Sequence, residues 1–109
     1  MMERYTVKLT RQAQAQLEEI VEYVASTLQA PGTALRLLDR LEQEIASLSS
    51  FPGRAALTEE EPWHSLGIHK LSVKNYLIYF WIDEAQHVVQ VTAIIHGRRD
   101  QRQQLSGMG

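Results

Sequence analysis

Residues 71–82, LSVKNYLIYFWI, and residues 88–100, VVQVTAIIHGRRD, decide the fold of this chain. β-branched and aromatic side chains dominate both stretches, and apolar residues at alternating positions indicate β-strands. Residues 76–82 and 88–95 are apolar on both faces, which is typical of central strands covered on both sides. A third strand is expected at 66–73, and short polar links join the three strands into a meander.

The N-terminal half has helical periodicity. Residues 5–9 alternate as a half-buried strand, and the Thr10 hydroxyl is suited to cap the helix that follows. Pro31 and Gly32 end this helix, and Pro31 is well placed to open a second one. Because the link is short, we expect the two helices to lie antiparallel. Their apolar stripes are Ala13, Leu17, Ile20, Val21, Val24 and Leu28, then Ala34, Leu38, Leu41, Ile45 and Leu48.

These elements predict an α+β fold with the order β-α-α-β-β-β. The N-terminal helical hairpin is expected to pack on one face of a largely antiparallel sheet. Residues 54–64 have no period and are expected to form a solvated loop, and residues 98–105 to form a short C-terminal helical turn. A chain of 109 residues is expected to be one domain, spanning 1–109.

Composition narrows the classes of function. The chain has no cysteine, which excludes disulfides and thiolate metal sites, and no metal-ligand spacing is present. We expect no cofactor. No apolar run reaches membrane-spanning length and no signal peptide is evident, so we expect a soluble, cytoplasmic protein without a membrane partner.

Charge is unevenly distributed along the chain. Residues 1–62 hold six Lys or Arg and ten Asp or Glu, a balance of −4, whereas residues 63–109 hold five and three, a balance of +2. Proteins that depend on phosphate contacts usually carry a strong basic surplus. The net charge of −2 therefore argues against broad, non-specific binding of nucleic acid.

A cluster of charged residues follows the last predicted strand. His96, Arg98, Arg99 and Asp100 stand within five residues. An imidazole transfers protons near neutral pH and guanidiniums stabilise a phosphorane, so His96, Arg98 and Arg99 are candidate catalytic residues for phosphodiester cleavage. The same groups also suit the carboxylates of a protein partner. The remaining interpretation is that they only solvate the end of a strand.

Other residues are candidates for partner contact. Lys70 and Lys74 suit a phosphate or an acidic partner, although lysines on a sheet edge more often prevent edge-to-edge aggregation. Alternation places Tyr79 and Trp81 on the face opposite Phe80, where they are expected at a protein-binding surface. The remaining candidates are Leu35, outside the main stripe of its helix, and Arg102, in the C-terminal segment.

In these residues the chain resembles the ParE/RelE superfamily of bacterial toxins from type II toxin–antitoxin modules. The resemblance covers nearly the whole length. It implies plasmid stabilization or growth inhibition by a toxin that a cognate antitoxin neutralises, in a homo- or hetero-oligomer. The matching parts are Leu9-Thr10, Ile20-x-x-Tyr23, Leu41 to Leu48 with Phe51-Pro52, Lys70-Leu71-x-Val73-x-Asn75-Tyr76-x-Ile78-x-Phe80 and Val91-x-x-Ile94-Ile95-His96-Gly97-Arg98-Arg99-Asp100.

The resemblance implies one of two activities. RelE-like members cut messenger RNA on the ribosome with basic residues and commonly a tyrosine or histidine near the C-terminus. Arg99 matches a basic residue of that set and His96 stands where some relatives use histidine, but Leu105 lies where the tyrosine is expected. ParE-like members instead bind and poison DNA gyrase without nuclease residues. The missing tyrosine and the pI of about 6.1 favour the ParE-like branch, with the RelE-like nuclease and an inactive antitoxin-binding scaffold as alternatives.

Overall fold

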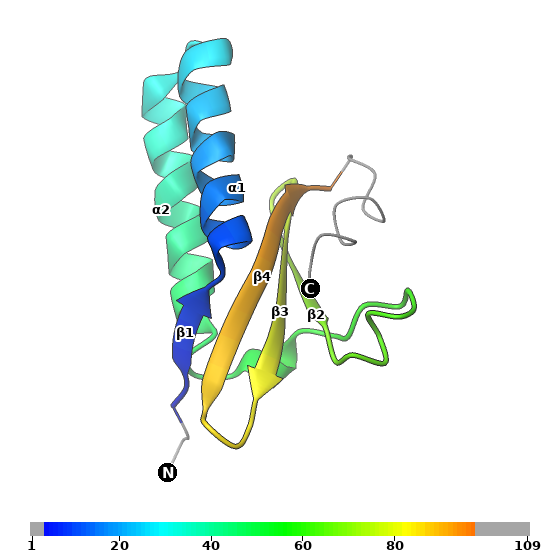
Figure 1. Ribbon diagram of the computed structural model, residues 1–109. Helices are drawn as coiled ribbons and strands as arrows, with labels where there is room; N and C mark the ends of the chain where they lie inside the picture. The colour runs from blue at the N-terminus through cyan, green and yellow to red at the C-terminus, as the bar shows by residue number, and fades with distance from the viewer. Residues whose placement is uncertain (1–3, 98–109) are drawn as a thin grey trace.

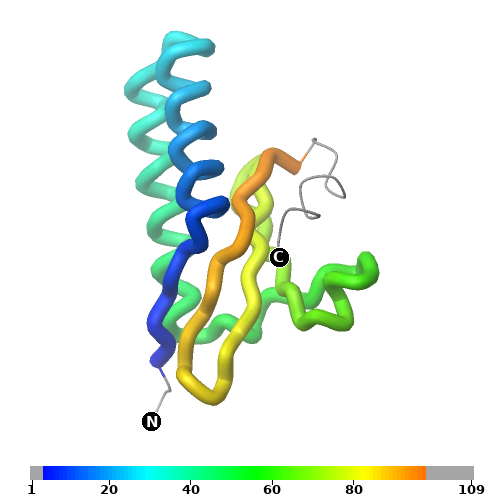
Figure 2. The backbone as a smooth tube through the Cα atoms, viewed as in Figure 1, coloured from blue at the N-terminus to red at the C-terminus, as the bar shows by residue number. Residues whose placement is uncertain are grey.

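The computed structural model describes residues 4–97 (Figures 1 and 2). Strand β1 (Thr6–Leu9) leads into helix α1 (Arg11–Glu22), and a π-helical turn, Tyr23–Thr27, extends that helix. Helix α2 (Pro31–Ser47) lies beside α1, and a short 3-10 turn (Pro52–Arg54) follows it. The chain then forms β2 (His69–Val73), β3 (Tyr76–Asp83) and β4 (Val88–His96).

The sheet is four-stranded and mixed, in the order β1-β4-β3-β2. β2, β3 and β4 are antiparallel neighbours, which confirms the predicted meander. β1 pairs with β4 in the parallel direction, from Thr6 opposite Val88 to Leu9 opposite Val91. The α+β prediction is therefore confirmed as two helices with a mixed sheet, and the predicted C-terminal helical turn lies outside the described residues.

Local chemistry explains where the helices begin and end. The Thr10 hydroxyl accepts a hydrogen bond of 3.1 Å from the Ala13 N–H and so caps α1, as predicted. Gln29 adopts a positive φ of 52° after the π-helical turn and ends the helix, a place that glycine usually takes. Pro31 opens α2, where its missing N–H costs nothing.

The sheet is buried on both faces, as the sequence predicts for β3 and β4. One face packs against the helices through a large cluster that includes Leu17, Leu41, Ile78 and Phe80. The other face is covered by the segment between α2 and β2, which contributes Trp63 and Ile68 to a second cluster. Residues 54–64 are therefore only partly the solvated loop that the sequence predicts: the three glutamates at 59–61 are exposed, but Trp63 is in a core.

Within residues 4–97, no helix is both long enough and apolar enough to cross a membrane.

Candidate functional site at the end of β4

A β-bulge in β4 determines which way His96 faces. Tyr79 pairs with Ala93 and Phe80 pairs with Val91, so Thr92 is an additional residue in β4. Val89 and Val91 pack on the helical face before the bulge, and Ala93 and Ile95 pack on the opposite face after it. Ile94 therefore faces the helices, and His96, two residues further on, faces α1 as well.

Two side chains of the N-terminal half hold this part of β4. The Thr10 hydroxyl donates a hydrogen bond of 3.3 Å to the Thr92 carbonyl, and the Thr10 N–H donates to the Val91 carbonyl at 2.9 Å. Beyond the end of β1, the Gln16 side-chain oxygen accepts a hydrogen bond of 2.8 Å from the Ile94 N–H. The first turns of α1 are thus fixed against β4 beside His96.

His96 lies in a pocket of about 370 Å³ between α1 and the ends of β3 and β4. Its ring meets the Tyr76 ring edge to face, with 5.2 Å between centroids and an interplanar angle of 86°. Glu19 contributes a carboxylate from α1. The lining residues in the described chain are Gln16, Glu19, Ile20, Tyr23, Tyr76, Ile94, Ile95 and His96.

Four groups that can transfer protons line this pocket: the His96 imidazole, the Glu19 carboxylate and the phenols of Tyr23 and Tyr76. Phosphodiester cleavage also needs cations that stabilise the phosphorane charge. The lining provided by residues 4–97 contains no lysine or arginine, and Glu19 would repel a phosphate. Arg98, Arg99 and Asp100, which the sequence groups with His96, lie outside the described residues, and so does Arg102.

The predicted partner-binding residues are spread over several surfaces. Lys70 and Lys74 are exposed, Lys70 on β2 and Lys74 in the turn before β3. Trp81 is 38% exposed on β3, and Leu35 is 63% exposed on α2. None of these four residues lines the His96 pocket, so they do not form one site with His96.

The expectation that Tyr79 lies at a protein-binding surface is wrong, because Tyr79 is only 1% exposed. Alternation placed Tyr79 opposite Phe80 correctly, but that face is covered by the segment that carries Trp63 and Ile68. Burial, with a smaller contribution from the Glu60 charge, raises the pKa of the Tyr79 hydroxyl to about 12.

Histidines hold the covering segment in place. The His69 Nδ1 lies 2.7 Å from the Ala55 carbonyl, and the His64 Nδ1 lies 2.8 Å from the Thr58 carbonyl. Since a carbonyl only accepts, Nδ1 carries the hydrogen in both rings. The His69 ring also stacks on Phe80 at 5.1 Å. These two imidazoles therefore have structural partners within the chain.

Four polar pocket residues, Gln16, Glu19, Tyr23 and Tyr76, were not candidate site residues from the sequence. A signal for Gln16 was available, because Gln16, Ile20 and Tyr23 repeat at intervals of four and three and so share one face of the helix. Nothing in the sequence indicates that this face meets the end of β4. No group of three or more His, Cys, Asp or Glu side chains suited to a metal ion occurs among the described residues.

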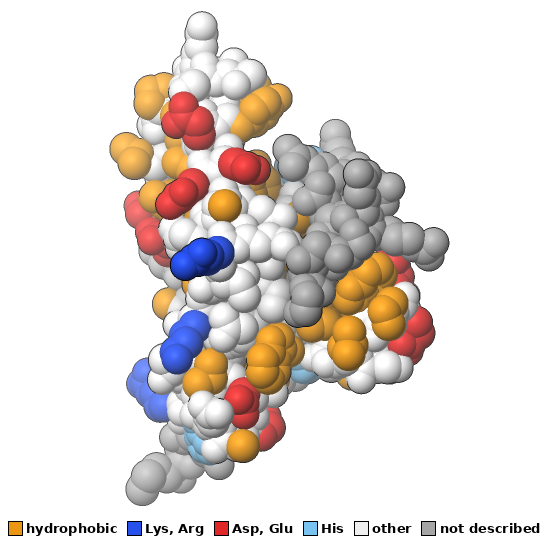
Figure 3. Space-filling model, viewed as in Figure 1, with side chains coloured by type: hydrophobic (Ala, Val, Ile, Leu, Met, Phe, Trp, Pro, Cys, Tyr) orange, Lys and Arg blue, Asp and Glu red, His pale blue; other side chains and the backbone are white. Residues whose placement is uncertain are grey.

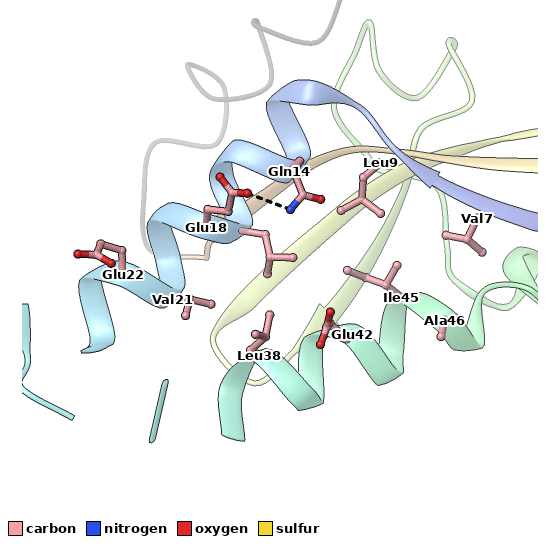
Figure 4. Close-up of a pocket in the computed structure, with 11 residues that line it drawn as sticks. Val7, Leu9, Gln14, Glu18, Val21, Glu22, Leu38, Glu42, Ile45 and Ala46 are labelled. Carbon is pink, nitrogen blue, oxygen red and sulfur yellow. Dashed lines mark hydrogen bonds between the residues drawn. The ribbon is translucent and has the colours of Figure 1, made fainter. Parts of the chain in front are cut away.

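A second, larger hollow lies on the other side of α1. It has a volume of about 780 Å³ and is formed by α1, α2 and β1 (Figure 4). Its floor is aliphatic, and glutamates from both helices stand beside it. The surface view shows acidic side chains gathered over the two helices (Figure 3).

The fold is shared with chains of solved toxin–antitoxin complexes. A chain of the chromosomal ParDE system from P. aeruginosa is similar with a TM-score of 0.69 and 21% identity, covering 85% of this chain and 96% of that one. A chain of the RelBE2 complex from Mycobacterium tuberculosis gives a TM-score of 0.62 and 21% identity, with 88% and 94% covered. A chain of the E. coli RelBE complex gives 0.58 and 13% identity, with 87% and 99% covered. No curated protein sequence matches significantly.

The family model for the ParE toxin of the type II toxin–antitoxin system parDE matches residues 7–101. This match spans most of the chain, so the protein belongs to the ParE toxin family, within the ParE/RelE superfamily of type II toxins.

Proposed function

We propose that this toxin inhibits DNA gyrase by binding it in the bacterial cytoplasm, and that a cognate antitoxin neutralises it. The family match supports the ParE-like branch. The observation that carries the proposal is the lining of the His96 pocket. Within the described chain it has a carboxylate, Glu19, and no cation, which is a poor setting for cutting a phosphodiester.

The proposed gyrase-binding surface uses the exposed candidates on the sheet together with the segment that follows β4. Lys70 and Lys74 supply positive charge, and Trp81 supplies a partly exposed aromatic ring of the kind that is enriched at interfaces. Arg98, Arg99 and Arg102 are proposed to add charge from the C-terminal segment.

The test is a supercoiling and cleavage assay with purified chain and purified gyrase. We expect supercoiling to stop and cleaved DNA complexes to accumulate, and Lys74→Glu with Trp81→Ala to weaken the effect about tenfold or more. Lys8→Glu, which makes the same charge change as Lys74→Glu at an exposed position of β1, is the control for charge. Gyrase activity that is unaffected by excess chain would refute the proposal.

The RelE-like nuclease is the second candidate, and the contact between His96 and Tyr76 favours it. In this function His96 acts as acid or base, and Arg98 or Arg99 stabilises the phosphate. A ribosome-dependent cleavage assay decides between the candidates: the nuclease cuts mRNA, and His96→Ala abolishes the cut. If induced expression without antitoxin neither arrests growth nor affects either target, the chain is an antitoxin-binding scaffold.

A further inference from the structure

The His96 pocket combines aromatic rings with a carboxylate. Its rings are those of Tyr23, Tyr76 and His96, and the carboxylate is that of Glu19. The Tyr76 and His96 rings are nearly perpendicular, at 86°, so two ring planes meet in a corner of the pocket. The face of an aromatic ring attracts a cation, and a carboxylate attracts one more strongly. The pocket therefore has the composition of a site for a positively charged group.

One face of α1 presents the carboxylate and one of the rings. Glu19 and Tyr23 are four residues apart, so they are neighbours on the helix surface. Gln16, about one turn earlier, accepts the Ile94 N–H at 2.8 Å and holds this face against β4. Tyr23 also begins the π-helical turn, and such turns occur frequently at functional sites. The two side chains are thus presented from a helix face that is fixed to the sheet.

No side chain of the described residues neutralises Glu19. This carboxylate is exposed and takes part in no ion pair within residues 4–97, where the salt bridge found joins Arg40 to Glu44. The Tyr23 ring beside it is 52% exposed and so is accessible to a partner. A partner's cation would therefore gain the attraction of Glu19 without displacing an ion pair of this part of the chain.

The size and lining of the pocket suit an arginine side chain. Its volume of about 370 Å³ lies at the lower end of the range for ligand pockets. Ile20 and Ile94 line it as well and offer apolar surface to a methylene stem. A guanidinium is planar, stacks on aromatic rings and is more weakly hydrated than an ammonium group, so arginine fits this lining better than lysine.

We propose that the His96 pocket receives an arginine side chain of gyrase, with the guanidinium among the three rings and beside Glu19. The inference rests on the proposed function, to which it adds a specific anchor on the gyrase side. Anchors of this kind, in which arginine enters a pocket with aromatic walls, are typical of the residues that dominate the energy of protein interfaces.

Gyrase is favoured as the source because the pocket adjoins the proposed gyrase-binding surface. Lys74 lies in the turn between β2 and β3, two residues before Tyr76. The Gly97 N–H donates to the carbonyl of Asn75 in this turn at 2.8 Å, so the turn lies at the same end of the sheet as the pocket. Lys74 and Glu19 thus present opposite charges at one end of the sheet, a pattern that fixes the orientation of a complementary partner.

The pocket is tested first without gyrase, by NMR titration of the purified chain with N-acetylarginine amide at about pH 8, where free imidazole is neutral. We expect the largest shifts at Tyr23, Tyr76 and His96, and Glu19→Gln should weaken binding about threefold or more. Tyr23→Ala should also weaken binding, whereas Tyr23→Phe, which keeps a ring, should not. Glu18→Gln is the matched control, since Glu18 is an exposed neighbour on α1 that lines the other hollow.

The supercoiling assay then tests gyrase as the source of the arginine. Glu19→Lys places a cation in the pocket and should weaken inhibition about tenfold or more, whereas Glu18→Lys should leave inhibition unchanged. Circular dichroism verifies that both variants fold, which is expected because both positions are exposed. If the unmodified chain does not inhibit gyrase, the proposed function fails, and the titration still decides whether the pocket holds a cation.

Three results of the titration would overturn the proposal. These are equal shifts with the neutral N-acetylnorleucine amide, shifts with inorganic phosphate but not with the arginine compound, and no shift up to about 50 mM. In the gyrase assay, inhibition by Glu19→Lys that equals inhibition by the unmodified chain would overturn it as well.

Discussion

The side-chain oxygen of Gln16 in α1 accepts a hydrogen bond of 2.8 Å from the backbone N–H of Ile94 in β4. β1 has ended by this point, so a helix side chain takes the position that a neighbouring strand would occupy. The Gln16 side chain thereby provides the acceptor for the Ile94 N–H at the edge of the sheet, and it holds α1 beside the pocket of His96.

Replacing Gln16 with leucine should lower the free energy of unfolding by about 1–3 kcal/mol, because the Ile94 N–H loses its acceptor while remaining partly buried. Urea denaturation measures the change. Gln14→Leu is the control, since Gln14 is exposed and its side chain bonds to the neighbouring Glu18 on the same helix. An equal loss in both variants would mean that helix propensity, not the bond to β4, causes the effect.

Thr10 joins two features, the start of α1 and the bulge at Thr92. Thr10→Ala removes both hydroxyl bonds and should destabilise the fold by about 1–2 kcal/mol. In NMR spectra, the amide shifts of Thr92 and Ile94 should move together with that of Ala13. Thr33→Ala, at an exposed position in α2, should change stability by less than about 0.5 kcal/mol. Changes confined to α1 would show that the hydroxyl does not hold the bulge.

The sequence predicts the elements whose signals are local. Thr10 as a cap, Pro31 as the first residue of a helix, and the meander of β2, β3 and β4 follow from side-chain type and spacing within a few residues. The parallel pairing of β1 with β4 joins residues about 80 positions apart, and no local signal carries it.

The candidate site was predicted less well than the fold, for two physical reasons. The bulge at Thr92 changes the phase of alternation, so the faces of Ala93 and Ile95 cannot be read from the first half of β4. The segment that covers Tyr79 has no periodicity in its sequence. Its Trp63 and Ile68 become core residues only when the chain folds back on the sheet. The bulge therefore determines which way His96 faces, and the segment that carries Trp63 and Ile68 buries Tyr79.

His69 should stabilise the packing of the segment between α2 and β2 on the sheet. His69→Leu removes the donor to the Ala55 carbonyl and the ring stacked on Phe80, and we expect a loss of about 1–3 kcal/mol. Hydrogen exchange should rise at the Thr58 and Lys70 amides, which bond across the same contact. Ser72→Leu, at an exposed position of β2, is the control. A uniform rise in exchange over the whole sheet would contradict a local role.

Tyr79 should make stability depend on pH at the alkaline end. Burial, followed by the Glu60 charge, raises its pKa from 10.0 to about 12, so the folded state retains the phenolic proton that the unfolded chain releases. Its contribution is therefore fully present below about pH 10 and is lost as pH rises toward about 12, with a slope of about 1.4 kcal/mol per pH unit. Urea denaturation across this range should show a shallower decline for Tyr79→Phe than for the unmodified chain. Tyr23→Phe, which removes the hydroxyl of an exposed tyrosine, is the matched control. Parallel declines for the unmodified chain and Tyr79→Phe would mean that the Tyr79 hydroxyl ionises as readily in the folded protein as in the unfolded one.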